Sequence, residues 1–191
     1  AFAENNQDNP GYPSLASNPV FQELYDLQDS EIKRREQGLA IQYRRTGLTA
    51  ESSTVTVKEV FTRSLDLSEH ETLKFFVYGD NSGNEFVFRI GNSAVNYFEF
   101  KAPMTFSGWR LYELDILDKN RDGQLDRNLA KSFNAFWQRR VGSPSLRNIT
   151  DITYGVVVPP GAAQTAASTF YFNEVHLTES VTITGQAHRA N

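Results

Sequence analysis

The sequence of 191 residues contains no cysteine. Disulfide bonds, thiol nucleophiles and thiolate metal ligands are therefore excluded. The chain also lacks any apolar run that approaches the roughly 20 residues with which an α-helix crosses a bilayer. Positive charge is scarce, because 19 Lys and Arg stand against 23 Asp and Glu and give a net charge of -4. Nucleic acid and anionic lipid are held by clustered positive charge, so the sequence disfavours both partners.

Recognisable catalytic signatures are missing as well. The sequence has no G-x-S-x-G elbow, no P-loop and no dinucleotide fingerprint. Its histidines, His70, His176 and His188, are not spaced as metal ligands are. Glu113 and Asp115 fall on one face of an expected strand, but acid pairs of this kind are common on solvent-facing strands. The sequence therefore predicts a protein that is not an enzyme, and a glycan-active enzyme is the least favoured alternative.

Aromatic residues are abundant, with 14 Phe and 8 Tyr, which indicates a sizeable core. From Gly38 onward, runs that alternate apolar and polar residues are separated by Gly, Asn, Asp and Ser, as is typical of short strands. These runs are GLAIQYRRTG, STVTVKEVF, ETLKFFVYGD, NEFVFRIGN, NYFEFKAP, GWRLYELDI, ITDITYGVVVPP and STFYFNEVHLTES. The pattern predicts an all-β antiparallel sandwich of the jelly-roll, galactose-binding-like kind.

Two local features predict how the strands connect. The segment DNSGNE, between Tyr78 and Phe86, has the composition of a hairpin turn. The run 170–177 is expected to be a central or near-edge strand that pairs with 39–43. Strand connections of this kind are typical of antiparallel sandwiches.

Composition divides the chain into three parts. They are a flexible lead-in with a short helix at 1–35, the sandwich module at 36–180, and a tail or linker at 181–191. The helix is predicted from Val20, Leu24 and Leu27, which recur at helical spacing behind Pro19. Together with Phe21, its leucines are expected to cover one end or edge of the sandwich.

Several segments occur in an order that resembles a known family. They are REQGLAIQYRRTGL, LDLSEHETLKFFVYGD, NEFVFRIGNSAVNYFEFKAP, VGSPSLRNITDITYGVV and FYFNEVHLTE. The set is similar to the soluble repeat modules of the SprA/Sov family, giant outer-membrane proteins of the type IX secretion and gliding motility apparatus. The resemblance covers roughly residues 35–191. It implies a non-enzymatic structural or interaction module of the bacterial cell envelope (periplasm, outer membrane or cell surface), whose partners are other envelope domains or proteins.

The segment DKNRDGQLD resembles the oxygen-rich loop with which EF-hand and dockerin proteins wrap calcium. The ligands would be Asp118, Asn120, Asp122, the backbone carbonyl of Gln124, and Asp126. Gly123 falls where such a loop turns sharply, but Leu129 replaces the bidentate acid that closes it. Three carboxylates this close together repel one another unless a cation lies between them. The segment therefore predicts a structural calcium ion, and the alternative is a solvated polar turn.

The second function that the sequence supports is that of a carbohydrate-binding module with a structural calcium ion. Sugar rings stack on exposed flat aromatics beside hydrogen-bonding groups. The candidate ligand-binding residues are Trp109, Trp137, Tyr97 and Tyr154. Tyr97 is followed by Phe98, so one of the two should face the core and the other the solvent. The opposite hypothesis places both tryptophans in the core.

The calcium hypothesis predicts that millimolar calcium raises the melting temperature, because an ion that binds only the folded state stabilises that state. Asp122→Ala is expected to abolish the rise. Thermal unfolding followed by circular dichroism, with and without calcium, measures both effects. An unchanged melting temperature of the wild-type protein in calcium would contradict the site.

Overall fold

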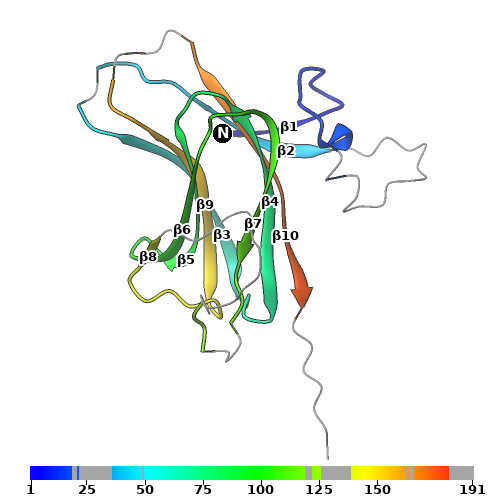
Figure 1. The fold of residues 1–191 in the computed structure, drawn as a ribbon, viewed down its shortest axis with the longest axis vertical. Coiled ribbons are helices and arrows are strands. Elements are labelled where there is room, and N and C mark those ends of the chain that lie inside the picture. The colour runs from blue at the N-terminus through cyan, green and yellow to red at the C-terminus, as the bar shows by residue number, and fades with distance from the viewer. Residues whose placement is uncertain are drawn as a thin grey trace, which may run out of the picture.

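The computed structural model describes residues 1–18, 21, 36–48, 50–118, 122–125, 139–161, 163 and 166–180. These residues form two antiparallel sheets that face each other as a sandwich (Figure 1). The predicted fold class is confirmed.

In the described part of the chain, each sheet has five strands. The first sheet has the order β1 (Phe2–Asn5), β2 (Gln37–Tyr43), β10 (Ser168–Ser180), β4 (His70–Asp80) and β7 (Ser107–Asp115). The second sheet has the order β3 (Ser53–Leu65), β9 (Ile149–Val158), β5 (Glu85–Ser93), β6 (Asn96–Pro103) and β8 (Arg139–Val141). Without the edge strands β1 and β8, this order is that of a jelly roll. All of the predicted runs are strands, whereas β1 and β8 were not predicted.

The core between the sheets is built from aromatic rings. Phe75 of β4 is fully buried at its centre. Its ring centroid lies 4.5 Å from that of Phe88 in the opposite sheet and 5.3 Å from that of Phe172 on the neighbouring strand. Burying a ring of this size contributes about 1.5–3 kcal/mol relative to leaving it exposed. The alternation of the strands thus places one row of aromatic side chains from each sheet in a single cluster.

The prediction that DNSGNE closes a β-hairpin is wrong. β4 pairs with β10 and β7 in the first sheet, whereas β5 pairs with β6 and β9 in the second. The turn itself is present, since Asn81 and Gly83 have the positive φ values of 52° and 74° that such residues tolerate. The chain therefore crosses from one sheet to the other at this point, because turn residues reverse the chain without choosing its next partner.

The pairing predicted between the first and last strands of the module is confirmed. Residues 168–172 of β10 pair with residues 39–43 of β2. Part of the expected lead-in is also a strand, because β1 pairs with the first half of β2. The chain forms one 3-10 turn, η1 (Leu15–Ser17), before the expected helix, whose residues Val20, Leu24 and Leu27 lie outside the described residues. Residues 22–35 and 181–191 lie outside the described part of the chain.

The N-terminal segment packs on the outer face of the first sheet. Leu15 and Phe21 form a second apolar cluster with Phe76, a β4 residue that points away from the main core. Phe21 thus covers a face of the sandwich, not the end or edge that was expected. Glu36 anchors this segment, since its carboxylate accepts hydrogen bonds from the Ser14 hydroxyl at 2.6 Å and from the Leu15 amide.

Because of a buried tyrosine beside the sheet-crossing turn, the free energy of unfolding is expected to fall at alkaline pH. Tyr43 donates a hydrogen bond to Asp80 at 2.6 Å and accepts one from Asn84 at 2.8 Å. Burial, followed by the hydrogen bond to Asp80, raises the pKa of Tyr43 to about 12. The unfolded pKa is about 10, so the contribution to stability is complete below pH 10. The free energy of unfolding should fall as the pH rises from about 10 to about 12.

Urea unfolding at pH 8 and pH 11 measures this decline. Tyr43→Phe should be less stable at pH 8 by about 1–2 kcal/mol, because Asn84 and Asp80 each lose a partner. The variant should also show a smaller loss between the two pH values, because it lacks the ionising hydroxyl. If the free energy of unfolding fell equally in both proteins between pH 8 and pH 11, Tyr43 would not be the cause of the pH dependence.

Candidate functional site

The outer face of the second sheet carries charged and polar side chains in two adjacent rows. One row crosses the strands at Lys58, Thr153, Arg89, Glu99 and Arg139, and the next at Val60, Asp151, Gly91, Tyr97 and Val141. Their neighbours in sequence on the same strands face the core, so period-two alternation points these side chains away from it. We call the residues Lys58, Arg89, Tyr97, Glu99, Asp151 and Thr153 the polar face.

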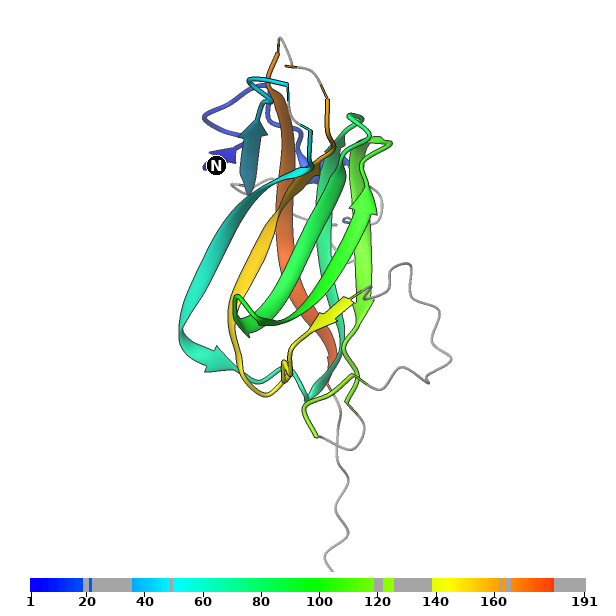
Figure 2. The ribbon, with the colours of Figure 1, turned by 90° about the vertical axis from the view of Figure 1, so that its left-hand side faces the viewer.

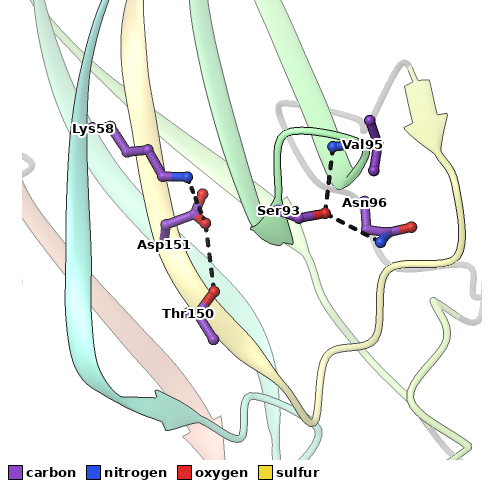
Figure 3. A network of polar contacts seen from close by, with 6 residues as sticks. All are labelled: Lys58, Ser93, Val95, Asn96, Thr150 and Asp151. Atoms are coloured by element: carbon purple, nitrogen blue, oxygen red, sulfur yellow. Dashed lines mark hydrogen bonds and ion pairs between the residues drawn. The ribbon is translucent and has the colours of Figure 1, made fainter.

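Ion pairs order the carboxylates of the polar face. Lys58 Nζ lies 2.9 Å from Asp151 Oδ2, and Figure 3 shows Thr150 on the other side of the same carboxylate, where its hydroxyl donates at 3.4 Å. Arg89 donates through Nε and Nη2 to Glu99 Oε2, both at 2.7 Å. Asp151 is 6% and Glu99 3% exposed, although both point out of the sandwich. The neighbouring long side chains therefore enclose these carboxylates and fix their positions.

One aromatic ring lies beside these ion pairs. The Arg89 guanidinium carbon stands 4.7 Å from the ring centroid of Tyr97, within the range of a cation–π contact. Tyr97 is partly exposed, whereas Phe98 is buried in the core. The prediction that the two residues face opposite sides is confirmed, and Tyr97 is the outward one.

The strands of the second sheet are curved. Figure 1 shows β3 and β9 diverging from the first sheet at one end of the sandwich. Figure 2 looks onto the outer face of the second sheet, with β9 and β5 across its middle and β3 at one margin. Outward-facing side chains of β3, β9, β5 and β6 therefore lie side by side across this face.

The structure does not bring Trp109 and Tyr154 to this face. Trp109 lies on the outer face of the first sheet, where its indole N–H donates to the Pro13 carbonyl at 2.7 Å and its ring packs against the N-terminal cluster. Tyr154 is buried, stacked on Phe172 with 4.7 Å between ring centroids. Burial raises the pKa of Tyr154, and the charge of Glu59 raises it further. The exposed platform expected at Tyr154 is therefore wrong, since this residue faces the core.

Trp137 lies outside the described residues. Of the four predicted aromatic ligands, the polar face holds Tyr97 among the described residues. The sequence analysis did not include Lys58, Arg89, Glu99 and Asp151 among the candidate binding residues. The signal that indicates them is a charged residue at an outward position of a strand whose inward positions are apolar.

The proposed calcium loop is held by its own hydrogen bonds. Asp118 is 1% exposed, and its two carboxylate oxygens accept from the amides of Asp122 at 3.0 Å and Gly123 at 2.7 Å. Gly123 has a φ of 86°, which confirms the left-handed turn. Gln124 donates through its side chain to the Pro144 carbonyl at 3.2 Å.

Two of the predicted calcium ligands, Asn120 and Asp126, lie outside the described residues. Among the described residues, no three His, Asp or Glu side chains are grouped as metal ligands. Binding of a calcium ion stays a prediction. The structure adds that the Asp118 carboxylate orders the turn through its hydrogen bonds.

The acid pair considered for catalysis is engaged in local contacts. Glu113 lies 2.7 Å from Lys74, and Asp115 accepts a hydrogen bond from the Leu117 amide at 2.9 Å. The described stretches of the chain contain no helix with the length and apolar character to cross a membrane.

Comparisons with known proteins establish similarity of fold. No protein-family model and no curated protein matches the chain. The structure of an exo-β-agarase aligns with a TM-score of 0.50 and 12% identity over 78% of this chain, which spans 21% of the agarase. A family 11 carbohydrate-binding module from Clostridium thermocellum, in complex with a β-1,3-1,4-mixed-linked tetrasaccharide, aligns with a TM-score of 0.48 and 16% identity over 76% of this chain and 77% of the module. The similarity to the exo-β-agarase structure supports the β-sandwich fold, and the SprA/Sov resemblance stays a prediction.

The ion pair of Arg89 and Glu99 on the polar face should stabilise the fold. Glu99→Gln is expected to lower the free energy of unfolding by about 1–3 kcal/mol, because it weakens the charge-assisted bonds to Arg89 at a buried position. Glu85→Gln is the matched control. Its pair with Lys101 is 3.9 Å long and lies on the same face, with Glu85 51% exposed. An exposed pair contributes about 0–1 kcal/mol. Urea unfolding compares the two, and equal losses would contradict the account of an ordered polar face.

Proposed function

We propose that this protein is a non-catalytic carbohydrate-binding module that holds a polysaccharide on the polar face of the second sheet. The observation that carries the proposal is the pair of outward-facing carboxylates, Asp151 and Glu99, each nearly enclosed and each fixed by a cation. Groups that are already ordered before binding lose little conformational entropy when a ligand arrives. The polar face therefore offers preorganised hydrogen-bond acceptors and donors to a ligand.

Sugar hydroxyls both donate and accept hydrogen bonds, so they complement a surface on which carboxylate and cationic groups alternate. Neighbouring strands lie about 4.8 Å apart, and the row from Lys58 through Arg89 to Glu99 crosses four of them. A polysaccharide lying across the strands would meet one polar side chain after another. Tyr97 adds an aromatic surface beside this row.

The charges of the polar face favour an uncharged polysaccharide. Lys58 is paired with Asp151 and Arg89 with Glu99, so the four charges cancel. An anionic glycan would have to displace one of these carboxylates from its cation. We assign both carboxylates to the positioning of Lys58 and Arg89 and not to proton transfer, because each is enclosed and held by its cation.

Isothermal titration calorimetry with the mixed-linked β-1,3-1,4-glucan tetrasaccharide and a panel of neutral oligosaccharides, including those of agarose, tests the proposal. Lys58→Ala and Tyr97→Ala should each weaken binding by about tenfold, the effect of losing one charge-assisted or stacking contact. Lys74→Ala is the matched control. It removes an ion pair of similar length, to Glu113 at 2.7 Å, from the other sheet and should leave the affinity unchanged.

If Lys74→Ala weakened glycan binding as much as Lys58→Ala does, the polar face would not be the binding surface. A wild-type protein that binds none of the glycans would contradict carbohydrate binding. The scaffold role in the bacterial envelope that the SprA/Sov resemblance implies would then be the better hypothesis.

A further inference from the structure

A cavity of about 550 Å³ lies between the sheets, away from the polar face. It lies where β10 extends beyond β2, because β2 pairs with β10 up to Phe172 and β10 continues to Ser180. Beyond that point β10 and the edge strand β3 form the two sides of the cavity. The register of β10 also shifts here, since Asn173 and His176 pair with Phe76 and Lys74 and leave two residues opposite one.

The walls of this cavity are apolar. They include Phe61, Leu67, Leu73, Ile90, Ile149 and Ile152. The stacked rings of Tyr154 and Phe172 also belong to the lining. Leu65 of β3 and Val175 of β10 contribute as well, and they remain 40% and 39% exposed. Large apolar side chains that stay exposed beside an apolar cavity indicate an opening that an apolar group can enter.

Polar groups of the lining make hydrogen bonds within the protein. The Asn173 amide donates to the Tyr12 hydroxyl at 3.1 Å and accepts from the Glu174 amide at 2.9 Å. His176 Nδ1 lies 2.9 Å from the Glu174 carbonyl. Among the described residues of the lining, Glu59 and Glu174 contribute carboxylates. The cavity thus combines apolar walls with negative charge.

We propose that this cavity binds the hydrocarbon chain of an amphiphile whose head group is neutral or cationic. The volume lies within the range of about 300–1,000 Å³ that ligand sites occupy. The apolar walls match an aliphatic chain, and the two carboxylates repel an anionic head group while they attract a cationic one. The site is separate from the polar face, so it does not depend on the glycan proposal.

Fluorescence of the neutral probe N-phenyl-1-naphthylamine tests the site. Its emission should rise on binding to the wild-type protein. Dodecyltrimethylammonium and dodecyl maltoside, below their micellar concentrations, should displace it at least about tenfold more effectively than dodecanoate, because of the carboxylates. Co-sedimentation with phosphatidylcholine vesicles then distinguishes a membrane lipid from a free amphiphile as the source of the chain.

Leu65→Asp places a carboxylate beside the apolar walls and should weaken probe binding by about tenfold or more, since an apolar chain would desolvate the charge. Val55→Asp is the matched control. Val55 lies on the same strand, is also 40% exposed, and is not part of the lining. Melting curves establish that each variant is folded. If Leu65→Asp does not fold, Glu59→Lys replaces it and should shift the preference toward dodecanoate.

The proposal is overturned if the wild-type protein does not enhance the probe, or if folded Leu65→Asp binds it as the wild type does. Displacement by dodecanoate as strong as that by the cationic amphiphile would equally overturn it. A result at this site leaves the glycan titration unaffected, because the polar face lies on the outside of the second sheet.

Discussion

The packing of Phe75 against the opposite sheet is the constraint on which the rest of the structure depends. Its contact with Phe88 fixes which residues of β4 and β5 face the core. Because side chains alternate along a strand, Lys74 and Arg89 must then face outward. A register slip of one residue would exchange the two faces and bury the charges. The aromatic core thus places the polar face as well as stabilising the fold.

The two outer faces of the sandwich differ because of what covers them. On the first sheet, Leu15 and Phe21 bury Phe76, and the Trp109 indole is tied to the Pro13 carbonyl. This face adds apolar burial to a module that has no disulfide. The second sheet presents ion pairs on its outer face instead. The first face therefore serves stability, and the second is suited to recognition.

Alternation predicted the strands of the jelly roll because a period of two is a local property of the sequence. It also predicted that Tyr97 and Phe98 face opposite sides. Tyr154 was assigned to the wrong side, although alternation places it on the same face as Ile152 and Val156, which belong to or pack against the core. β1 was missed because its four residues, FAEN, show no alternation and become a strand only by pairing with β2.

Contacts between distant parts of the chain could not be predicted. Lys58 and Asp151 meet because β3 pairs with β9, and their register is set by the whole sandwich. The sequence shows each charge but not its partner. The same limit explains the error at DNSGNE, where the turn chemistry was correct and the choice of sheet depended on the core. The residues of the polar face are thus brought together only when the sheets are assembled.

Backbone amide chemical shifts recorded during titration with a neutral oligosaccharide test the central claim most directly. The account predicts that amides of β3, β9, β5 and β6 around Thr153 shift in proportion to saturation, while those of β4 and β7 in the first sheet do not. Shifts centred on Trp109 and the N-terminal segment, or no shifts with any glycan, would contradict it.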